Sequence, residues 1–339
     1  MILNREELRQ KLAVLSKAYS SKTPQPALQF AKFDNDEIMV SNNNATIITK
    51  FETGIQALIP FKQLNDICNK LTASELDLTI NDNQAIIKCG RSRFALNLGD
   101  FNEFPNYSVL SDAESLKVNC SEFISVISAI NYATSNNEKR PILTGVNFSE
   151  FAVATDSFRL ARINKDLGLR CTIARSDIDN LISILKGSEE VLIRNTKNTA
   201  TFIFGDTIYQ TRLLDGNYPD TSRLIGNEFN YSIKVDRIKL IESIERVNIF
   251  NEEYATIILD ANNGVLKLSS NATQVGDATD ELSCENHDNI KFACNGQYLK
   301  EALIKFRKDV VELNLVSSMK PITIKEDDMV ALVLPVKVE

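Results

Sequence analysis

The chain has 339 residues, of which 43% are hydrophobic and 24% charged, and its formal net charge is −7. This length allows two or three domains with ordinary hydrophobic cores. No apolar run approaches the roughly 20 residues of a transmembrane helix, which excludes a membrane span, and the acidic balance excludes a protein coated with basic surface.

The N-terminal segment and the cysteines indicate a cytoplasmic protein. A charge appears within the first five residues and no long apolar region follows, so we expect no secretory signal. Six cysteines are scattered without a CxxC pair, which favours reduced thiols over a disulfide framework or a zinc site. The single histidine, His287, lies in a polar loop, which argues against imidazole catalysis.

The first predicted elements are an amphipathic helix, a set of strands and a second helix. Asn4 caps the first helix, with Glu7 three residues later in a capping-box arrangement, and Pro60 opens the second. Leucines at helical spacing form the apolar stripe of the first helix. Strands are expected at 27–33, 46–52, 76–80, 85–89 and 93–98.

The same order of signals occurs twice more along the chain. Ser121 and Ser176 are predicted to cap the helices of the second copy, and Asp236 and Asn295 those of the third. In the third copy the helix after Asp236 is expected to bury a stripe that begins at Ile238. Strands are expected at 142–148, 152–158, 191–194, 200–204, 208–214, 255–261, 265–271, 310–316, 321–325 and 329–336.

Six helix-plus-strand units therefore pair into three repeats with a period of roughly 110 residues, which is typical of whole domains. Polar, turn-rich links place the domains at 1–112, 113–227 and 228–339. Helices segregated to one side of antiparallel sheets make an α+β fold. Three such domains in a row predict an elongated, curved body with all the helices on one face.

Basic side chains on the predicted helices are candidates for contact with nucleic acid. Lys186, Lys300 and Lys305 are examples, although a basic residue on a helix is usually just solvated. Collected on one face of an acidic protein, they indicate a surface that faces phosphate. Few aromatic residues accompany them, which favours duplex backbone over stacked single strands.

Motifs for catalysis, nucleotide binding and metal binding are missing from the sequence. It contains no GxxxxGK[ST] loop, no GxGxxG after a strand, no GxSxG, no HExxH and no EF-hand loop. We therefore expect a binding protein that is not an enzyme and that needs no cofactor or metal.

Seven short strings occur in order across all three repeats and identify a family. They are GRSRF at 90–94, FPNY at 104–107, RPILTGV at 140–146, ATDSFRLA at 154–161, LLDGNYPD at 213–220, NGQYLKEAL at 295–303 and LVLPVKV at 332–338. On these strings the chain resembles the bacterial sliding clamp, the β subunit of DNA polymerase III. Each string is weak alone, but together they span almost the whole chain.

The resemblance implies the DNA clamp fold: three repeated domains, each with two helices and antiparallel sheets, closing as a head-to-tail homodimeric ring around duplex DNA. It implies a processivity factor whose partners are the replicative polymerase, the clamp loader and other proteins that carry clamp-binding peptides. A clamp-fold paralogue that serves as a partner-binding platform without a replicative role remains the alternative. An enzyme built on the repeat would need catalytic groups that the sequence does not offer.

For the dimer contact, the resemblance points to one edge of the first domain and one of the third. Alternation in the RSRFAL segment suits an edge strand with a charged and an apolar row. An ordinary edge strand with Phe94 in the core of its own domain is the alternative. The matching positions are Arg91, Arg93, Phe94 and Leu96 in the first domain, with Ile249, Phe250, Asp277 and Asp280 in the third.

The resemblance also implies a peptide-binding pocket between the second and third domains. Its apolar residues with a few polar groups suit a short peptide with Leu and Phe anchors. The matching positions are Leu143, Thr155, Ser157, Phe158, Arg159, Leu160, Pro219, Arg223, Leu224, Asn295, Tyr298, Met319, Pro321, Leu334, Pro335, Val336, Lys337 and Val338.

Two departures and two DNA positions complete the comparison with the family. Members commonly carry Gly-His where this chain has Ser157-Phe158, which replaces a hydrogen-bonding ring with an apolar one. One further residue, Glu339, follows Val338. Family positions for DNA contact correspond to Lys22 and Asn137.

Overall fold

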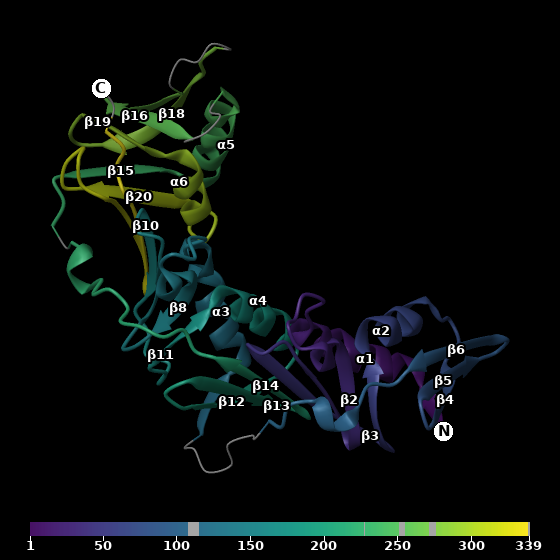
Figure 1. The fold of residues 1–339 in the computed structure, drawn as a ribbon. Helices are drawn as coiled ribbons and strands as arrows, with labels where there is room; N and C mark the ends of the chain where they lie inside the picture. The colour runs from purple at the N-terminus through teal and green to yellow at the C-terminus, as the bar shows by residue number, and fades with distance from the viewer. Residues whose placement is uncertain (108–114, 227, 251–254, 271–275, 338–339) are drawn as a thin grey trace. The chain divides into compact units, whose positions relative to one another are not determined.

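A computed structural model describes residues 1–107, 115–226, 228–250, 255–270 and 276–337 (Figure 1). The chain forms two compact units, the first from residues 1–124 and 179–213 and the second from residues 125–178 and 214–339. Among the described residues, no helix is both long enough and apolar enough to cross a membrane.

Six α-helices and only antiparallel strand pairs occur in the described residues, which confirms the predicted α+β class and the two helices per repeat. In the first unit α1 packs beside α2, and in the second α5 packs beside α6. The helices are α1 (Arg5–Leu15), α2 (Phe61–Lys70), α3 (Cys120–Ile130), α4 (Arg175–Ile184), α5 (Arg237–Val247) and α6 (Gly296–Leu303).

Every one of these helices follows directly on the last residue of a strand. A residue at the N-cap keeps an extended backbone, so it can end a strand and cap a helix at once. Asn4, Asp236 and Asn295 do both. The strands are β1 (Ile2–Asn4), β3 (Ala45–Pro60), β7 (Leu116–Asn119), β11 (Cys171–Ala174), β15 (Tyr231–Asp236) and β19 (Ile290–Asn295).

Three of the predicted helix caps are confirmed and two are wrong. The side chains of Asn4, Asp236 and Asn295 accept backbone N–H groups at 2.9 to 3.0 Å. For α3, however, Asn119 accepts the N–H of Glu122 at 3.1 Å, so the cap lies two residues before Ser121. Helix α4 begins at Arg175, which places Ser176 inside its first turn.

The first unit holds two antiparallel sheets. One has four strands in the order β1-β4-β5-β6, and the other has six in the order β2-β3-β14-β13-β12-β7. The strands not yet given are β2 (Phe30–Ser41), β4 (Glu75–Asn81), β5 (Gln84–Cys89), β6 (Ser92–Asn97), β12 (Glu190–Asn195), β13 (Thr199–Phe204) and β14 (Thr207–Arg212).

Helix stripes and sheet faces supply the core of the first unit. The predicted leucine stripe of α1 is fully buried. Phe202 packs against Phe123 of α3 and Tyr209 of β14, with ring centroids 5.9 and 6.4 Å apart. Burial of such large side chains supplies most of the driving force for folding.

A single sheet of twelve strands runs through the second unit, in the order β11-β8-β9-β10-β22-β21-β20-β15-β18-β17-β16-β19. Its fourth and fifth strands, β10 and β22, pair with Leu160 opposite Leu332, so strands from the second and third repeats share one sheet. The strands not yet given are β8 (Gly145–Phe148), β9 (Ala152–Thr155), β10 (Arg159–Ile163), β16 (Thr256–Asn262), β17 (Val265–Ser270), β18 (Thr279–Asn286), β20 (Val310–Leu315), β21 (Ile322–Glu326) and β22 (Met329–Val333).

Two of the expected strands that end earlier than predicted give way to loops near the candidate site. The segment 152–158 stops at Thr155 and turns at Ser157, whose φ is +80°. The last strand stops at Val333, and Pro335 then forms an isolated bridge to Cys294. Both changes expose short loops that carry candidate site residues.

In the third repeat, the predicted stripe of α5 is shifted on the helix. Ile238 is 46% exposed, whereas Leu240, Ile244 and Val247 are fully buried. Isoleucine at position 238 therefore does not belong to the core, and Leu240 takes its place.

Candidate functional site

Five expected pocket residues are large apolar side chains that the second unit leaves exposed. Exposed apolar side chains that lie together on a surface are typical of docking sites. Their exposed fractions are 61% for Phe158, 54% for Leu224, 58% for Met319, 38% for Leu334 and 37% for Val336. We call these five residues the docking surface.

Phe158 stands at the tip of the β9–β10 turn, which hydrogen bonds hold in shape. The carboxylate of Asp156 accepts the N–H groups of Phe158 and Arg159, both at 2.9 Å. The hydroxyl of Thr155 donates to the carbonyl of Arg159 at 2.6 Å. Because the backbone is fixed in this way, the phenyl ring is presented outward at a defined place.

Arg159 lies beneath the docking surface and links two elements. Its Nε donates to Asp156 at 2.9 Å, and its Nη1 donates to Glu301 of α6. Its guanidinium also lies 4.3 Å from the ring centroid of Tyr298, within the range of a cation–π contact. With 9% exposure it has little surface for a ligand, so it acts as a positioning residue that ties the turn to α6.

Leu143, Thr155 and Leu160 are also buried. Leu160 packs in a cluster with Val153, Val330 and Leu332, and Tyr218 covers that cluster. Burial raises the pKa of Tyr218 well above its usual value. These residues therefore support the docking surface from below.

The remaining expected pocket residues differ in exposure. Asn295, Tyr298, Pro321 and Pro335 are half-buried. Exposed residues are Ser157, Pro219, Arg223 and Lys337. The side chain of Asn295 is committed to capping α6, where it accepts the N–H of Tyr298 at 3.0 Å.

The C-terminal segment, residues 334–337, which we call the tail, connects the β9–β10 turn to strand β19 at the edge of the sheet. The N–H of Leu334 donates to the carbonyl of Phe158 at 2.9 Å, and the N–H of Val336 donates to the carbonyl of Ala293 in β19 at 2.8 Å. These two bonds fix Leu334 and Val336 beside the turn. Val338, the last expected pocket position, lies outside the described residues.

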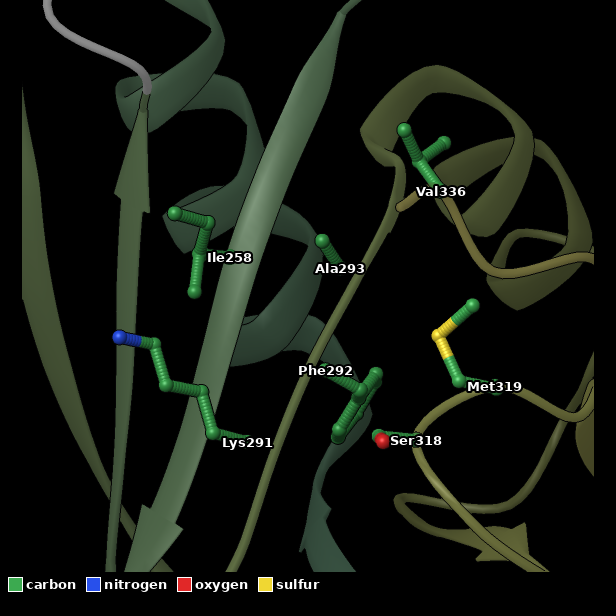
Figure 2. A pocket seen from close by; sticks show the side chains of 7 residues that line it. All are labelled: Ile258, Lys291, Phe292, Ala293, Ser318, Met319 and Val336. Carbon is green, nitrogen blue, oxygen red and sulfur yellow. The ribbon is translucent and has the colours of Figure 1, made fainter. Parts of the chain in front are cut away.

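A cavity of about 320 Å³ opens beside this segment (Figure 2). Met319 and Val336 of the docking surface contribute to its wall. The other lining residues, which the sequence did not point to, are Ile258, Lys291, Phe292, Ala293 and Ser318. Four of them lie on the paired strands β16 and β19, and the hydrogen bond from Val336 to Ala293 holds the C-terminal segment beside these strands.

The expected dimer residues of the first unit lie on an open sheet edge. Strand β6 ends the four-stranded sheet, so one side of it has no paired strand within that sheet. Phe94 and Leu96 are half-buried there, and Arg91 and Arg93 are exposed. The partial exposure of Phe94 counts against a place in the core of its own domain.

The expected dimer residues of the second unit differ in availability. Ile249 is 74% exposed and Asp277 is exposed. The ring of Phe250 is half-buried and lies against Gly276. Asp280 already accepts Nη2 of Arg246 of its own unit at 2.6 Å, so it enters any contact as a paired carboxylate.

The expected DNA-facing residues also differ in their exposure and in the partners that they already have. Lys22 and Lys186 are exposed, whereas Lys305 is half-buried. Lys300 pairs with Glu245 of α5 at 2.9 Å, which neutralises part of its charge. Asn137 is exposed but accepts the N–H of Lys139 at 3.0 Å within a tight turn.

Acidic, histidine and cysteine side chains do not cluster in the described residues. These residues contain no group of three or more His, Cys, Asp or Glu side chains that could hold a metal ion. The six cysteines are free. Burial raises the pKa of Cys171 and Cys294 to about 12 and that of Cys68 to about 11, so these thiols stay protonated at neutral pH.

Comparison with protein families gives three matches in chain order. They are the N-terminal domain of the DNA polymerase III beta subunit over residues 1–108, its central domain over 117–220, and its C-terminal domain over 222–337. Together they span nearly the whole chain.

Curated relatives agree with these matches. The beta sliding clamp of Staphylococcus epidermidis strain RP62A is 27% identical over 357 residues, which cover 95% of this chain and 94% of the relative. The beta sliding clamp of Staphylococcus aureus strain Mu50 has the same identity and coverage.

Solved structures show the same fold. The sliding clamp from Bacillus subtilis has a TM-score of 0.91 at 23% identity, covering 100% of this chain and 99% of its own. The DNA polymerase III beta chain from Streptococcus pneumoniae has a TM-score of 0.93 at 24% identity, covering 99% of each chain. A Pseudomonas aeruginosa sliding clamp bound to griselimycin has a TM-score of 0.91 at 22% identity, covering 100% and 99%.

Proposed function

The chain belongs to the DNA polymerase III β subunit family, the sliding clamps, and we propose how its own residues perform the work of a processivity factor. It is a non-catalytic subunit, and DNA and the polymerase are the partners that its family implies. We propose three domains at 1–112, 113–227 and 228–339, and a cytoplasmic location.

The proposed ring is a head-to-tail homodimer that encloses duplex DNA. Support comes from two open sheet edges. Strand β6 has a free side and carries Arg93, with Arg91 just before it. Strand β18 pairs with β15 only through residues 284–286, so among the described strands residues 279–283 have no partner on that side. This stretch carries Asp280, which pairs with Arg246, and Glu281, which pairs with Lys267. Strand pairing between copies would close both edges.

Within the ring, the helices would face DNA without reading its sequence. Lys22, Lys186 and Lys305 would supply weak, salt-sensitive attraction to phosphate, and Asn137 would lie nearby. Lys300 would contribute less because Glu245 pairs with it. Contacts with the phosphate backbone carry no sequence information, which suits a protein that slides.

The docking surface is the proposed binding site for peptides of the polymerase, the clamp loader and other partners. The observation that carries this proposal is the set of five exposed apolar side chains on a backbone that hydrogen bonds hold rigid. Rigid apolar anchors lower the ordering cost of binding. Phe158 makes the site more apolar than the histidine that family members commonly carry, which favours apolar peptide anchors.

Fluorescence anisotropy with a labelled Gln-Leu-Ser-Leu-Phe peptide tests this site. We expect micromolar affinity, about −8 kcal/mol, because such a peptide has few anchors and must be ordered on binding. Phe158→Asp and Leu224→Asp should each weaken binding at least about tenfold, since each removes an apolar contact. Ile304→Asp is the matched control, because Ile304 is 51% exposed on the same unit but outside the docking surface. Unchanged affinity in both docking-surface variants would mean that partners bind elsewhere.

A further inference from the structure

The cavity beside the tail lies on the outer face of the sheet at its edge. Ile258 pairs with Ala293 across β16 and β19, so these two side chains share one face of the sheet. The alternate residues Ile257 and Cys294 are fully buried in the core. Figure 2 shows Ile258, Lys291 and Ala293 along the two strands, with Met319 and Val336 facing them across the cavity.

This cavity continues the docking surface. Met319 and Val336 belong to both, and the hydrogen bond from Val336 to Ala293 fixes the tail at the boundary between them. A peptide that leaves the docking surface over Met319 or Val336 would therefore reach the cavity within a few residues, because an extended chain spans about 3.3 Å per residue.

The charges around the cavity are mainly positive, although the whole chain is acidic. Lys291 lines the cavity and is exposed. Lys320 and Lys337 adjoin Met319 and Val336 in the sequence and are exposed too. One carboxylate, Asp260, lies opposite Lys291 across the strand pair, and Lys267 lies on its other side. Among the described residues, none of these three flanking lysines, 291, 320 and 337, has an ion pair.

We infer that this cavity is an accessory subsite for partner peptides, which takes an apolar side chain that is followed or preceded by a carboxylate. Ile258, Ala293, Met319 and Val336 would enclose the apolar group, and Lys291 would pair with the carboxylate, with the hydroxyl of Ser318 as a further polar partner. The inference rests on the proposed docking function and adds a sequence preference outside the peptide's core anchors.

Anisotropy with three labelled peptides tests this subsite. The first is the pentapeptide Gln-Leu-Ser-Leu-Phe, and the other two carry an Ile-Glu pair, joined through one glycine, at its N-terminus or its C-terminus. One of the two extended peptides should bind roughly tenfold more tightly than the pentapeptide, since one buried apolar side chain outweighs the cost of ordering it.

Two variants in the cavity should remove that gain without changing pentapeptide binding. Lys291→Glu reverses the charge, and Ser318→Phe fills the space. Lys267→Glu is the matched control, because Lys267 is an exposed lysine on the same sheet face but two strands away from β19. The gain should survive in this control. Lys291 is exposed, so its variant should fold even if Ser318→Phe does not.

The outcomes separate the two proposals. If the pentapeptide binds but neither extension adds affinity, or if the gain persists in both cavity variants, the subsite is wrong while the docking function stands. If only an extended peptide binds, and binding needs Lys291, the subsite stands without the pentapeptide site. If no peptide binds, both proposals fail.

Discussion

At the scale of single residues, Ser157 and Phe158 set the character of the docking surface. Ser157 has a φ of +80°, a region that glycine occupies without strain and serine does not. The turn nevertheless holds, because Thr155 accepts the N–H of Ser157 at 3.2 Å and Asp156 accepts the two that follow. A serine with these bonds can therefore replace the glycine that family members commonly carry here.

Arg159→Ala should lower stability more than the removal of a surface ion pair. The substitution removes the cation that pairs with Asp156, whose side chain is 11% exposed, and it removes the tie to Glu301. Breaking a buried ion pair in this way costs about 3 kcal/mol or more. Chemical denaturation should show a clearly lower midpoint.

Arg170→Ala is the matched control for that change. Arg170 also pairs with an aspartate, Asp166, but the two side chains are 52% and 45% exposed. Exposed pairs contribute little because water and salt screen them. If both variants had the same midpoint, Arg159 would not be the structural tie that its contacts indicate.

Burial explains why the expected pocket positions were only partly predictable. The family motifs pointed to residues such as Leu160 and Phe158 together, but only packing shows that Leu160 supports the surface while Phe158 forms it. The cavity residues Ile258 and Lys291 carried no motif at all. Their role depends on the tail, which lies next to β19 in space but not in the sequence.

At the scale of elements, long amphipathic helices and alternating strands were predictable, and short strands were not. The strand before each helix was missed in five of six cases. Segments such as β1, with three residues, and β7, with four, are too short to show a period of two, whereas β15 and β19, with six residues each, were missed although they are as long as β12. Strand β10 was missed because it follows β9 after a turn of three residues, 156–158, that reads as a continuation.

A contact between elements predicts a pH effect on the first unit. Lys11 of α1 donates to Asp206 in the turn between β13 and β14, which ties the first repeat to the second. Burial raises the pKa of Asp206, but the hydrogen bond and the charge of Lys11 outweigh burial, so its pKa lies below the ordinary value of 3.8. Because the pKa of Asp206 is lower in the folded state than in the unfolded state, the pair stabilises the fold fully at pH values above the ordinary pKa. This stabilisation is lost as the pH falls through the folded-state pKa.

Asp206→Asn should therefore reduce stability at neutral pH and lose less stability than the parent protein when the pH falls below about 4. Thermal unfolding at a series of pH values measures this difference. Asp82→Asn is the control, since Asp82 is exposed in the β4–β5 turn and its removal changes the net charge equally. Parallel pH curves for the parent protein and Asp206→Asn would contradict the assignment.

At the scale of the whole molecule, the threefold repeat was visible in the sequence, but the division into two compact units was not. The reason lies in strand pairing. In the first unit β14 of the second repeat pairs with β3 of the first, with Ile208 opposite Ile48. In the second unit β10 of the second repeat pairs with β22 of the third. The central repeat thus shares its strands with both neighbours, and periodicity along the chain cannot show which edges meet.

Pairing of sheet edges, which joins neighbouring repeats within the chain, also underlies our prediction that β6 forms the dimer contact. Phe94→Asp places a charge among half-buried apolar residues of β6 and should yield folded monomers, because burial of each such side chain contributes roughly 1.5 to 3 kcal/mol to a contact. Light scattering at low micromolar concentration should give the mass of a dimer for the parent protein and of one chain for the variant.

Phe158→Asp provides the matched control, since it makes the same substitution on the docking surface and not on β6. It should remain a dimer and lose peptide binding, whereas Phe94→Asp should keep peptide binding and lose the dimer.

Loaded onto nicked circular DNA by a clamp loader, the parent ring should resist a high-salt wash and leave when the DNA is linearised, because a closed ring is held by topology and salt weakens only the attraction to phosphate. A Phe94→Asp protein that stayed dimeric, or a parent protein that left the intact circle in high salt, would show that β6 does not close a ring.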